Sequence, residues 1–335
     1  MEQRIKQSIL ATLAYFDIFD YPLTQLELGR FLYAEDGGKW KDTEVAEQLR
    51  HLENIHQLRH KEGYYFLFGR EEIVDRRQRN IWFIERKMKK AIRGVKKLAH
   101  IPFVRAVFVC NTVSGVGIDE KSDIDVFIIT KKGRIFLARA IATLYLSLFN
   151  LRRTKRKVKD KICLSFYVAD DNLNLQGISL PDLSGVASAK IDLSGVALAK
   201  PDIYLMYWLA QLIPVYDPDN LLSSLQKANT WVKKYLPNAF SGYDLLSRWQ
   251  VENNKFWQSL KFFFEKTWQN SYGDLLEKQA KEMQLNKMKM NYTSVQNEPD
   301  TRVIVNDKML KFHEKDKRAE YRERWVQKFN GLDLG

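Results

Sequence analysis

Residues 107–130 read VFVCNTVSGVGIDEKSDIDVFIIT and are the most informative part of the chain. The apolar runs at the two ends predict two strands, and the residues between them predict a turn rich in glycine and serine, then a short polar segment. The second strand begins at Ser122. Side chains alternate along a strand, so Asp123 and Asp125 project from the same face. The sequence therefore predicts two neighbouring carboxylates at the start of an otherwise apolar strand.

Two neighbouring carboxylates indicate a cation site. They repel each other unless a positive ion lies between them, and oxygen ligands suit Mg²⁺, which takes one or two carboxylates and completes its shell with phosphates. The preceding turn offers backbone N–H groups to an anion, and its glycines allow close approach. The alternative, a solvated strand end, is less favoured because aspartate is a poor strand former. The stretch therefore predicts nucleotide chemistry.

The same stretch resembles the nucleotidyltransferase superfamily of the DNA polymerase beta type. That superfamily has a Gly-Ser turn, a spacer and an Asp-x-Asp motif on the next strand. Here Asn-Thr stands in place of Gly-Ser, and asparagine adopts positive φ more readily than most residues, so we expect the turn to be kept. A predicted helix over 134–149 and the strand ICLSFYV (162–168) continue the superfamily's strand–strand–helix–strand order. The resemblance implies that nucleotide is bound by Asn111, Thr112, Ser114, Gly115, Gly117 and Ser122.

The resemblance also implies a two-metal catalytic centre with a third carboxylate on the later strand. The candidate is Asp160, where that strand should begin. Cys163 and Ser165 lie farther along and cannot replace a carboxylate as a ligand of a hard metal. The expected catalytic and metal-binding residues are thus Asp123, Asp125 and Asp160. Two Mg²⁺ ions are expected, or one if Asp160 is not a ligand.

Residues 1–69 predict three helices followed by a β-hairpin, an order that resembles a winged-helix domain. Thr24 and Glu27 form a capping-box pair that opens the second helix. The third helix carries only Arg50 against four carboxylates, at Asp42, Glu44, Glu47 and Glu53. DNA phosphates would be repelled by this face, so packing or dimerisation is a better expectation than DNA binding. His56 and His60 are four residues apart without a third ligand pattern, and we expect ordinary surface histidines.

The net charge of +13 is concentrated in two segments. Residues 70–100 contain eleven basic and four acidic residues, a net +7, and predict a long amphipathic helix over 71–99. The loop at 152–161 contains seven basic residues and one acidic residue, a net +6. Localised positive charge attracts polyanions, so RNA or another polyanion is an expected partner of both segments. The alternative is a solvated helix face and a solvated loop.

The predicted organisation is α+β: an N-terminal winged helix, a central small mixed-sheet nucleotidyltransferase domain and a C-terminal helical region. The expected boundaries are 1–69, 70–100 for the basic linker helix, 101–180, 181–201 and 202–335. The segment 181–201 contains DLSGVASAKI followed by DLSGVALAKP, which we interpret as a duplicated loop. In the C-terminal region, Asp307 is expected to cap a final charged helix.

Four phrases carry a second likeness: LAYFDIFDYPLT, KDKICLSFYV, DIYLMYWLAQLIPVYD and MLKFHEKDKR. They resemble bacterial proteins that join a winged-helix start to such a nucleotidyltransferase domain. This likeness implies no particular substrate.

Several protein classes are disfavoured by composition. The two cysteines cannot build a disulfide framework or a four-cysteine zinc site. The first residues lack the layout of a secretory signal, and the apolar runs at 140–150 and 203–216 are too short to span a bilayer. We therefore expect a soluble cytoplasmic protein without a membrane partner.

Three functions remain open from the sequence. The first is Mg²⁺-dependent transfer of a nucleoside monophosphate from ATP or another nucleoside triphosphate to a protein, small-molecule or nucleic-acid acceptor. In this reaction Asp160 would help to activate the acceptor hydroxyl, and the turn would bind the β- and γ-phosphates. The second is a catalytically degenerate protein of the same fold that binds nucleotide or nucleic acid. The third, a winged-helix regulator, is weakened by its acidic third helix.

Overall fold

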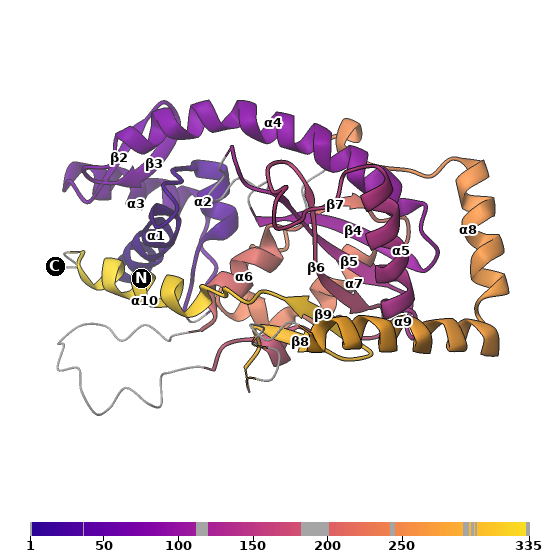
Figure 1. The fold of residues 1–335 in the computed structure, drawn as a ribbon. Coiled ribbons are helices and arrows are strands. Elements are labelled where there is room, and N and C mark those ends of the chain that lie inside the picture. The colour runs from indigo at the N-terminus through magenta and orange to yellow at the C-terminus, as the bar shows by residue number, and fades with distance from the viewer. Residues whose placement is uncertain are drawn as a thin grey trace.

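The computed structural model describes residues 2–35, 37–111, 120–181, 201–241, 245–290, 295, 298 and 300–332. The predicted turn residues Thr112, Ser114, Gly115 and Gly117, and most of the duplicated loop, lie outside the described residues. The described residues form an α+β fold with ten α-helices, a three-stranded antiparallel sheet and a six-stranded mixed sheet (Figure 1). The α+β class predicted from the sequence is confirmed.

The large sheet is built around three central strands, β4 (Val104–Cys110), β5 (Ile124–Thr130) and β6 (Ile162–Ala169). β4 and β5 are antiparallel, whereas β5 and β6 are parallel and are joined through α5 (Ile135–Leu148). A parallel pair needs such a crossover because the chain must return from the end of the first strand to the opposite end of the sheet, where the second strand begins. The predicted order of strand, strand, helix and strand is confirmed for these elements.

The C-terminal region contributes strands to both edges of this sheet, in the order β7-β4-β5-β6-β9-β8. These strands are β7 (Ile213–Tyr216), β8 (Val303–Val305) and β9 (Met309–Phe312). The prediction of a helix starting after Asp307 is therefore wrong at its beginning, since α10 spans Arg318–Asn330. The physical reason is that the backbone of β6 would be unpaired along one edge, and β9 satisfies it with antiparallel hydrogen bonds.

Side chains of the central strands alternate between the two faces of the large sheet. Val107, Val109 and Ile128 pack into a core with α5 and with α4 (Glu72–Ala99), the long basic helix whose predicted extent is confirmed. On the other face Phe127 contacts Trp208 of α6 (Ile203–Ala210), with ring centroids 5.3 Å apart. By the same alternation the strand start that carries the two aspartates belongs to the α6 face.

The N-terminal elements share this second core. They are α1 (Glu2–Asp17), α2 (Gln25–Phe31), α3 (Asp42–Asn54) and the small sheet of β1 (Leu23–Thr24), β2 (Leu58–Lys61) and β3 (Tyr64–Leu67). The predicted three helices, hairpin and capping box are present. Trp325 of α10 is fully buried and donates its indole N–H to the carbonyl of Ala11, which ties the end of the chain to α1.

The remaining helices cover the flank and ends of the sheet (Figure 1). They are α7 (Leu221–Ala228), α8 (Lys255–Thr267) and α9 (Ser271–Lys289), with short 3-10 turns at Gln176–Ile178, Thr230–Lys234 and Ser247–Trp249. α9 packs along α5, and Glu277 accepts hydrogen bonds from the backbone at the start of that helix. In the described part of the chain, no helix combines the length and the apolar character needed to cross a membrane.

Candidate functional site

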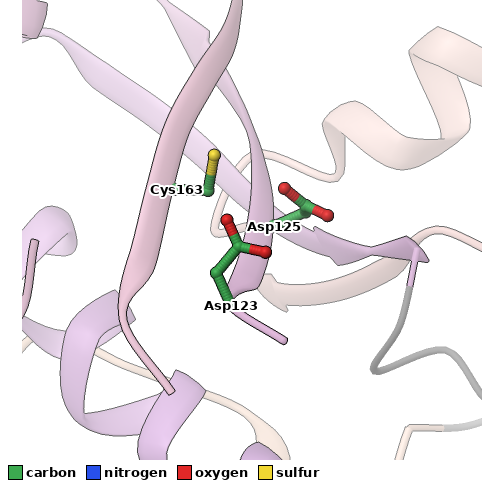
Figure 2. A group of neighbouring side chains, drawn as sticks. All are labelled: Asp123, Asp125 and Cys163. Carbon is green, nitrogen blue, oxygen red and sulfur yellow. The ribbon is translucent and has the colours of Figure 1, made fainter. Parts of the chain in front are cut away.

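Asp123 and Asp125 lie at the beginning of β5, on the face covered by α6. In the sheet register Asp125 lies between Cys110 of β4 and Cys163 of β6. Figure 2 shows the two carboxylates and the Cys163 thiol gathered at this point. One potential ligand atom from each of these three residues lies within 4.8 Å of the others. The alternation of side chains along β5 places the two aspartates on one face, as predicted from the sequence, and the parallel strand β6 adds Cys163 to them.

The donor atoms of this group favour a hard cation held by the two carboxylates. Burial, followed by the nearby carboxylate of Asp125, raises the pKa of the Cys163 thiol, so the sulfur is protonated and neutral. A neutral thiol is a poor ligand for a hard ion, whereas carboxylate oxygens suit Mg²⁺. The residues present therefore fit one Mg²⁺ ion whose remaining positions are filled by phosphate or water.

The surroundings of Asp125 disfavour its ionised form. Its burial, together with the charge of Asp123, raises its pKa above the ordinary aspartate value. Asn111 opposes this effect by donating from Nδ2 to Oδ2 of Asp125 at 3.0 Å, and the Tyr204 hydroxyl donates to Oδ1 of Asn111 at 3.1 Å. Asn111 has a φ of 55°, the left-handed conformation expected from its place in the turn. A chain of hydrogen bonds thus fixes the orientation of Asp125.

Asp123 is paired with a cation from the basic loop at 152–161. The Nε of Arg153 lies 2.6 Å from Oδ2 of Asp123, and the two side chains are 47% and 17% exposed. Part of the repulsion between the aspartates is therefore balanced by this guanidinium. The sequence predicted that the aspartates need a cation, but it gave no reason to choose Arg153 from among the seven basic residues of this loop.

Asp160 is placed with lysines of α4 and is not a member of the group around Asp123 and Asp125. Its carboxylate is 7% exposed and lies 3.3 Å from Nζ of Lys87, whose side chain is fully buried. It also lies 2.5 Å from Nζ of Lys90, whose side chain is 40% exposed. Burial works against ionisation, but the two lysines outweigh it and lower the pKa of Asp160. Asp160 thus does not join the two aspartates as a third carboxylate, and the geometry favours the alternative with one Mg²⁺ ion.

The same buried contacts fix the start of β5 through Ser122. The Ser122 carbonyl accepts from Lys87 Nζ at 2.7 Å and from the Asp160 N–H at 3.0 Å. Lys87 and Asp160 therefore position the strand that carries the acidic pair.

The aspartates open into a pocket of about 630 Å³, a volume typical of small-molecule sites. Its walls include Arg153 and a segment that the sequence interpretation missed, residues 311–318, which follows β9. This segment is part of the phrase MLKFHEKDKR, which was assigned to a helix. The apolar–polar–apolar alternation of Leu310, Lys311 and Phe312 was the signal for a strand, and four residues are too few for it to stand out.

A buried ion network holds this segment in place. Arg318 is 6% exposed and donates to Asp202 at 2.7 Å, while both Arg318 and Lys311 pair with Asp316 at 2.9 and 3.0 Å. Arg318 also donates to the carbonyl of Ile178 at 2.8 Å. Removing one member would leave a buried charge unpaired, so the conformation of the segment is strongly specified.

Aromatic side chains and a neutral histidine complete the pocket. Tyr204 and Tyr321 stack with ring centroids 5.4 Å apart, and Phe166 stacks on Trp208 at 5.5 Å. His313 Nε2 lies 3.1 Å from the Ser165 hydroxyl. Burial, with the charge of nearby Lys311, lowers the pKa of His313 to about 4, so the ring is neutral near pH 7.

Many cations of the 70–100 segment are already paired inside the molecule. Arg70, Arg76 and Arg77 bind carboxylates of the N-terminal elements, and Lys87 and Lys90 share Asp160. The expected polyanion surface therefore loses much of the charge counted from the sequence. The exposed basic residues of the 152–161 loop lie next to the pocket, which Arg153 lines.

Comparisons with known proteins identify no relative of this chain: no family model, curated protein or solved structure matches it significantly.

Proposed function

We propose that this protein is a Mg²⁺-dependent nucleotidyltransferase that transfers a nucleoside monophosphate from a nucleoside triphosphate to an acceptor. The observation that carries the proposal is the composition of one pocket, in which a pair of carboxylates, several cations and stacked aromatic rings occur together. Carboxylates hold the metal, cations complement phosphate and rings contact a base. The order of β4, β5, α5 and β6, which the superfamily resemblance implies, gives further support.

Asp123 and Asp125 would hold the ion, and bound Mg²⁺ would supply charge neutralisation of the triphosphate. The other residues have positioning roles. Asn111 and Tyr204 keep the Asp125 carboxylate oriented, and Lys87 with Asp160 keeps the strand start in place. The attacking hydroxyl of the acceptor forms the new ester bond at the α-phosphorus, and pyrophosphate leaves.

A second candidate function is nucleotide binding without transfer, and Cys163 favours it. This residue is the parallel partner of Asp125, so a neutral thiol lies beside the acidic pair where a further carboxylate would complete a two-metal site. A protein with this arrangement would retain triphosphate binding and lack turnover.

The two candidates are separated by following label from ATP labelled in its α-phosphate, with Mg²⁺ and with RNA, protein and small-molecule acceptors supplied in turn. The nucleotidyltransferase proposal expects label on an acceptor and release of an equal amount of pyrophosphate. Tight Mg²⁺-dependent binding of ATP without label transfer to any acceptor class would favour the binding function instead.

For the N-terminal part we propose a winged-helix arrangement used for packing. Three helices with a three-stranded sheet are the elements of that fold. Val45, Leu49 and Leu52 of α3 are buried in the shared core, and its exposed face is acidic. Such a surface does not complement DNA phosphates. A gel-shift assay with mixed-sequence duplex DNA tests this, and salt-sensitive binding that is lost when α3 is altered would refute it.

A further inference from the structure

The segment 311–318 contributes both buried and exposed cations to the wall of the pocket. Lys311, Lys315, Lys317 and Arg318 all line the pocket that contains the acidic pair. Their roles differ because their burial differs: Lys311 and Arg318 are buried, whereas Lys315 and Lys317 are exposed.

The two buried cations already have partners. Lys311 pairs with Asp316, and Arg318 pairs with Asp316 and Asp202, so two positive charges are matched by two negative ones. These groups hold the segment together, and their charges largely neutralise each other.

The two exposed lysines are available to a ligand. No described residue forms an ion pair with Lys315, and Lys317 makes only a long contact with Glu320 at 3.8 Å. Two exposed carboxylates lie beside them: Glu314 in the pocket lining, and Glu320, which Lys317 shares with Arg324. Ammonium groups in this setting can donate hydrogen bonds to a phosphate, and such charge-assisted bonds are stronger than neutral ones.

The backbone that carries the lysines is fixed before any ligand arrives. β9 is hydrogen-bonded to β6, and the N–H of His313 donates to the Arg302 carbonyl at 3.1 Å. On the other side Lys317 is the residue before α10, and the Arg318 N–H at the start of this helix donates to Asp316 Oδ1 at 3.1 Å. A rigid support of this kind reduces the ordering cost of binding.

We infer that Lys315 and Lys317 hold the terminal phosphates of the nucleoside triphosphate, so that the segment after β9 reads the length of the phosphate chain. This inference rests on the proposed function and adds to it a specificity-determining pair that selects triphosphate over monophosphate. A monophosphate reaches the acidic pair through its metal but has no phosphate left for the lysines.

The test measures binding of ATP, ADP, AMP and inorganic tripolyphosphate by calorimetry, each with Mg²⁺, in the full chain. The variants are Lys315→Ala, Lys317→Ala and the double substitution. The matched control is Lys308→Ala, an exposed lysine between β8 and β9 that does not line the pocket. The lysines are exposed, so the variants are expected to melt at the wild-type temperature.

Wild type is expected to bind ATP more tightly than ADP and ADP more tightly than AMP. Each substitution should weaken ATP binding by up to about fivefold, since both lysines are exposed and solvent screens their charge. The double variant should lose most of the preference for ATP over AMP, with AMP affinity and the Lys308→Ala control unchanged. Parallel loss of tripolyphosphate binding would assign the effect to phosphate rather than to the nucleoside.

Two results would overturn the inference in distinguishable ways. If wild type prefers ATP and the double variant keeps the full ATP-to-AMP ratio, the lysines do not hold the terminal phosphates, and the proposed function is untouched. If wild type binds none of the three nucleotides with Mg²⁺, the proposed function fails and this inference fails with it.

Discussion

The ion pair between Arg153 and Asp123 predicts competition between the protein's own cation and a metal ion. The Arg153 Nε lies 2.6 Å from Oδ2 of Asp123, so an ion that binds this carboxylate is expected to compete with the guanidinium. Arg153→Gln removes the competing charge, so the repulsion between Asp123 and Asp125 is less balanced. Divalent cations should then bind the nucleotide-free protein more tightly.

The magnitude follows from exposure. Two unit charges about 4 Å apart interact by about 1 kcal/mol in water and by about 4 kcal/mol near a protein surface. Because Arg153 is 47% exposed, solvent screens the pair, and a value of about 1 kcal/mol is appropriate. This corresponds to about a fivefold tighter dissociation constant for Mn²⁺, used as a spectroscopic substitute for Mg²⁺.

The assay is Mn²⁺ titration followed by electron paramagnetic resonance, at low salt and without nucleotide. Arg156→Gln is the matched control: it removes one positive charge from the same loop at an exposed residue that does not line the pocket. Equal Mn²⁺ affinity for Arg153→Gln and Arg156→Gln would refute direct competition, since it would leave only a general effect of net charge.

Two further substitutions test the neighbouring contacts. Asp160→Asn should lower the free energy of unfolding by about 2 kcal/mol at pH 7, because it removes the carboxylate that pairs with buried Lys87. The pKa of Asp160 is lower in the folded state than in the unfolded state, where it is about 4. The stabilisation by Asp160 is therefore complete above about pH 4 and is lost as the pH falls through the folded-state pKa. Chemical denaturation at pH 7 and pH 3 checks this, and an equal gap between variant and wild type at both pH values would contradict it. Cys163→Asp should lower the melting temperature in chelator, because a third carboxylate is added to a buried acidic group, and Mn²⁺ should restore it. A melting temperature that Mn²⁺ raises no more in Cys163→Asp than in the control Cys163→Ser, which keeps the two aspartates, would show that this position does not face the metal.

The centre of the fold and the acidic pair could be predicted because their signals are local. The strands around 107–130 are strongly apolar, and the alternation that places Asp123 beside Asp125 depends only on strand geometry. The same holds for the capping box at Thr24 and Glu27, which involves residues three apart.

The parts that could not be predicted depend on contacts distant in sequence. β9 is a strand because it satisfies the edge of β6, about 140 residues earlier in the chain, and four residues give little periodicity of their own. The pocket wall at 311–318 follows from that pairing. Its cations were visible in the sequence, but their place beside the acidic pair was not.

Lys87 is an intermediate case. It was counted with the solvated cations of α4, yet it lies at helical spacing between Ile84 and Ala91 on the apolar stripe, and it is fully buried. That spacing was an available sign that one lysine points inward. What the sequence did not reveal is its partner, Asp160, which lies more than seventy residues away and was instead read as a metal ligand.

The central claim is that Asp123 and Asp125 bind a metal–triphosphate complex, and calorimetric titration of ATP with and without Mg²⁺ tests it most directly. Asp123→Asn and Asp125→Asn keep the size of the side chains and remove the charge, so both variants should fold, as thermal melts will check. The account predicts Mg²⁺-dependent ATP binding in wild type and a loss of at least tenfold in affinity in each variant, because each carboxylate supplies a direct ligand. ATP binding with Mg²⁺ as tight in both variants as in wild type would contradict the account.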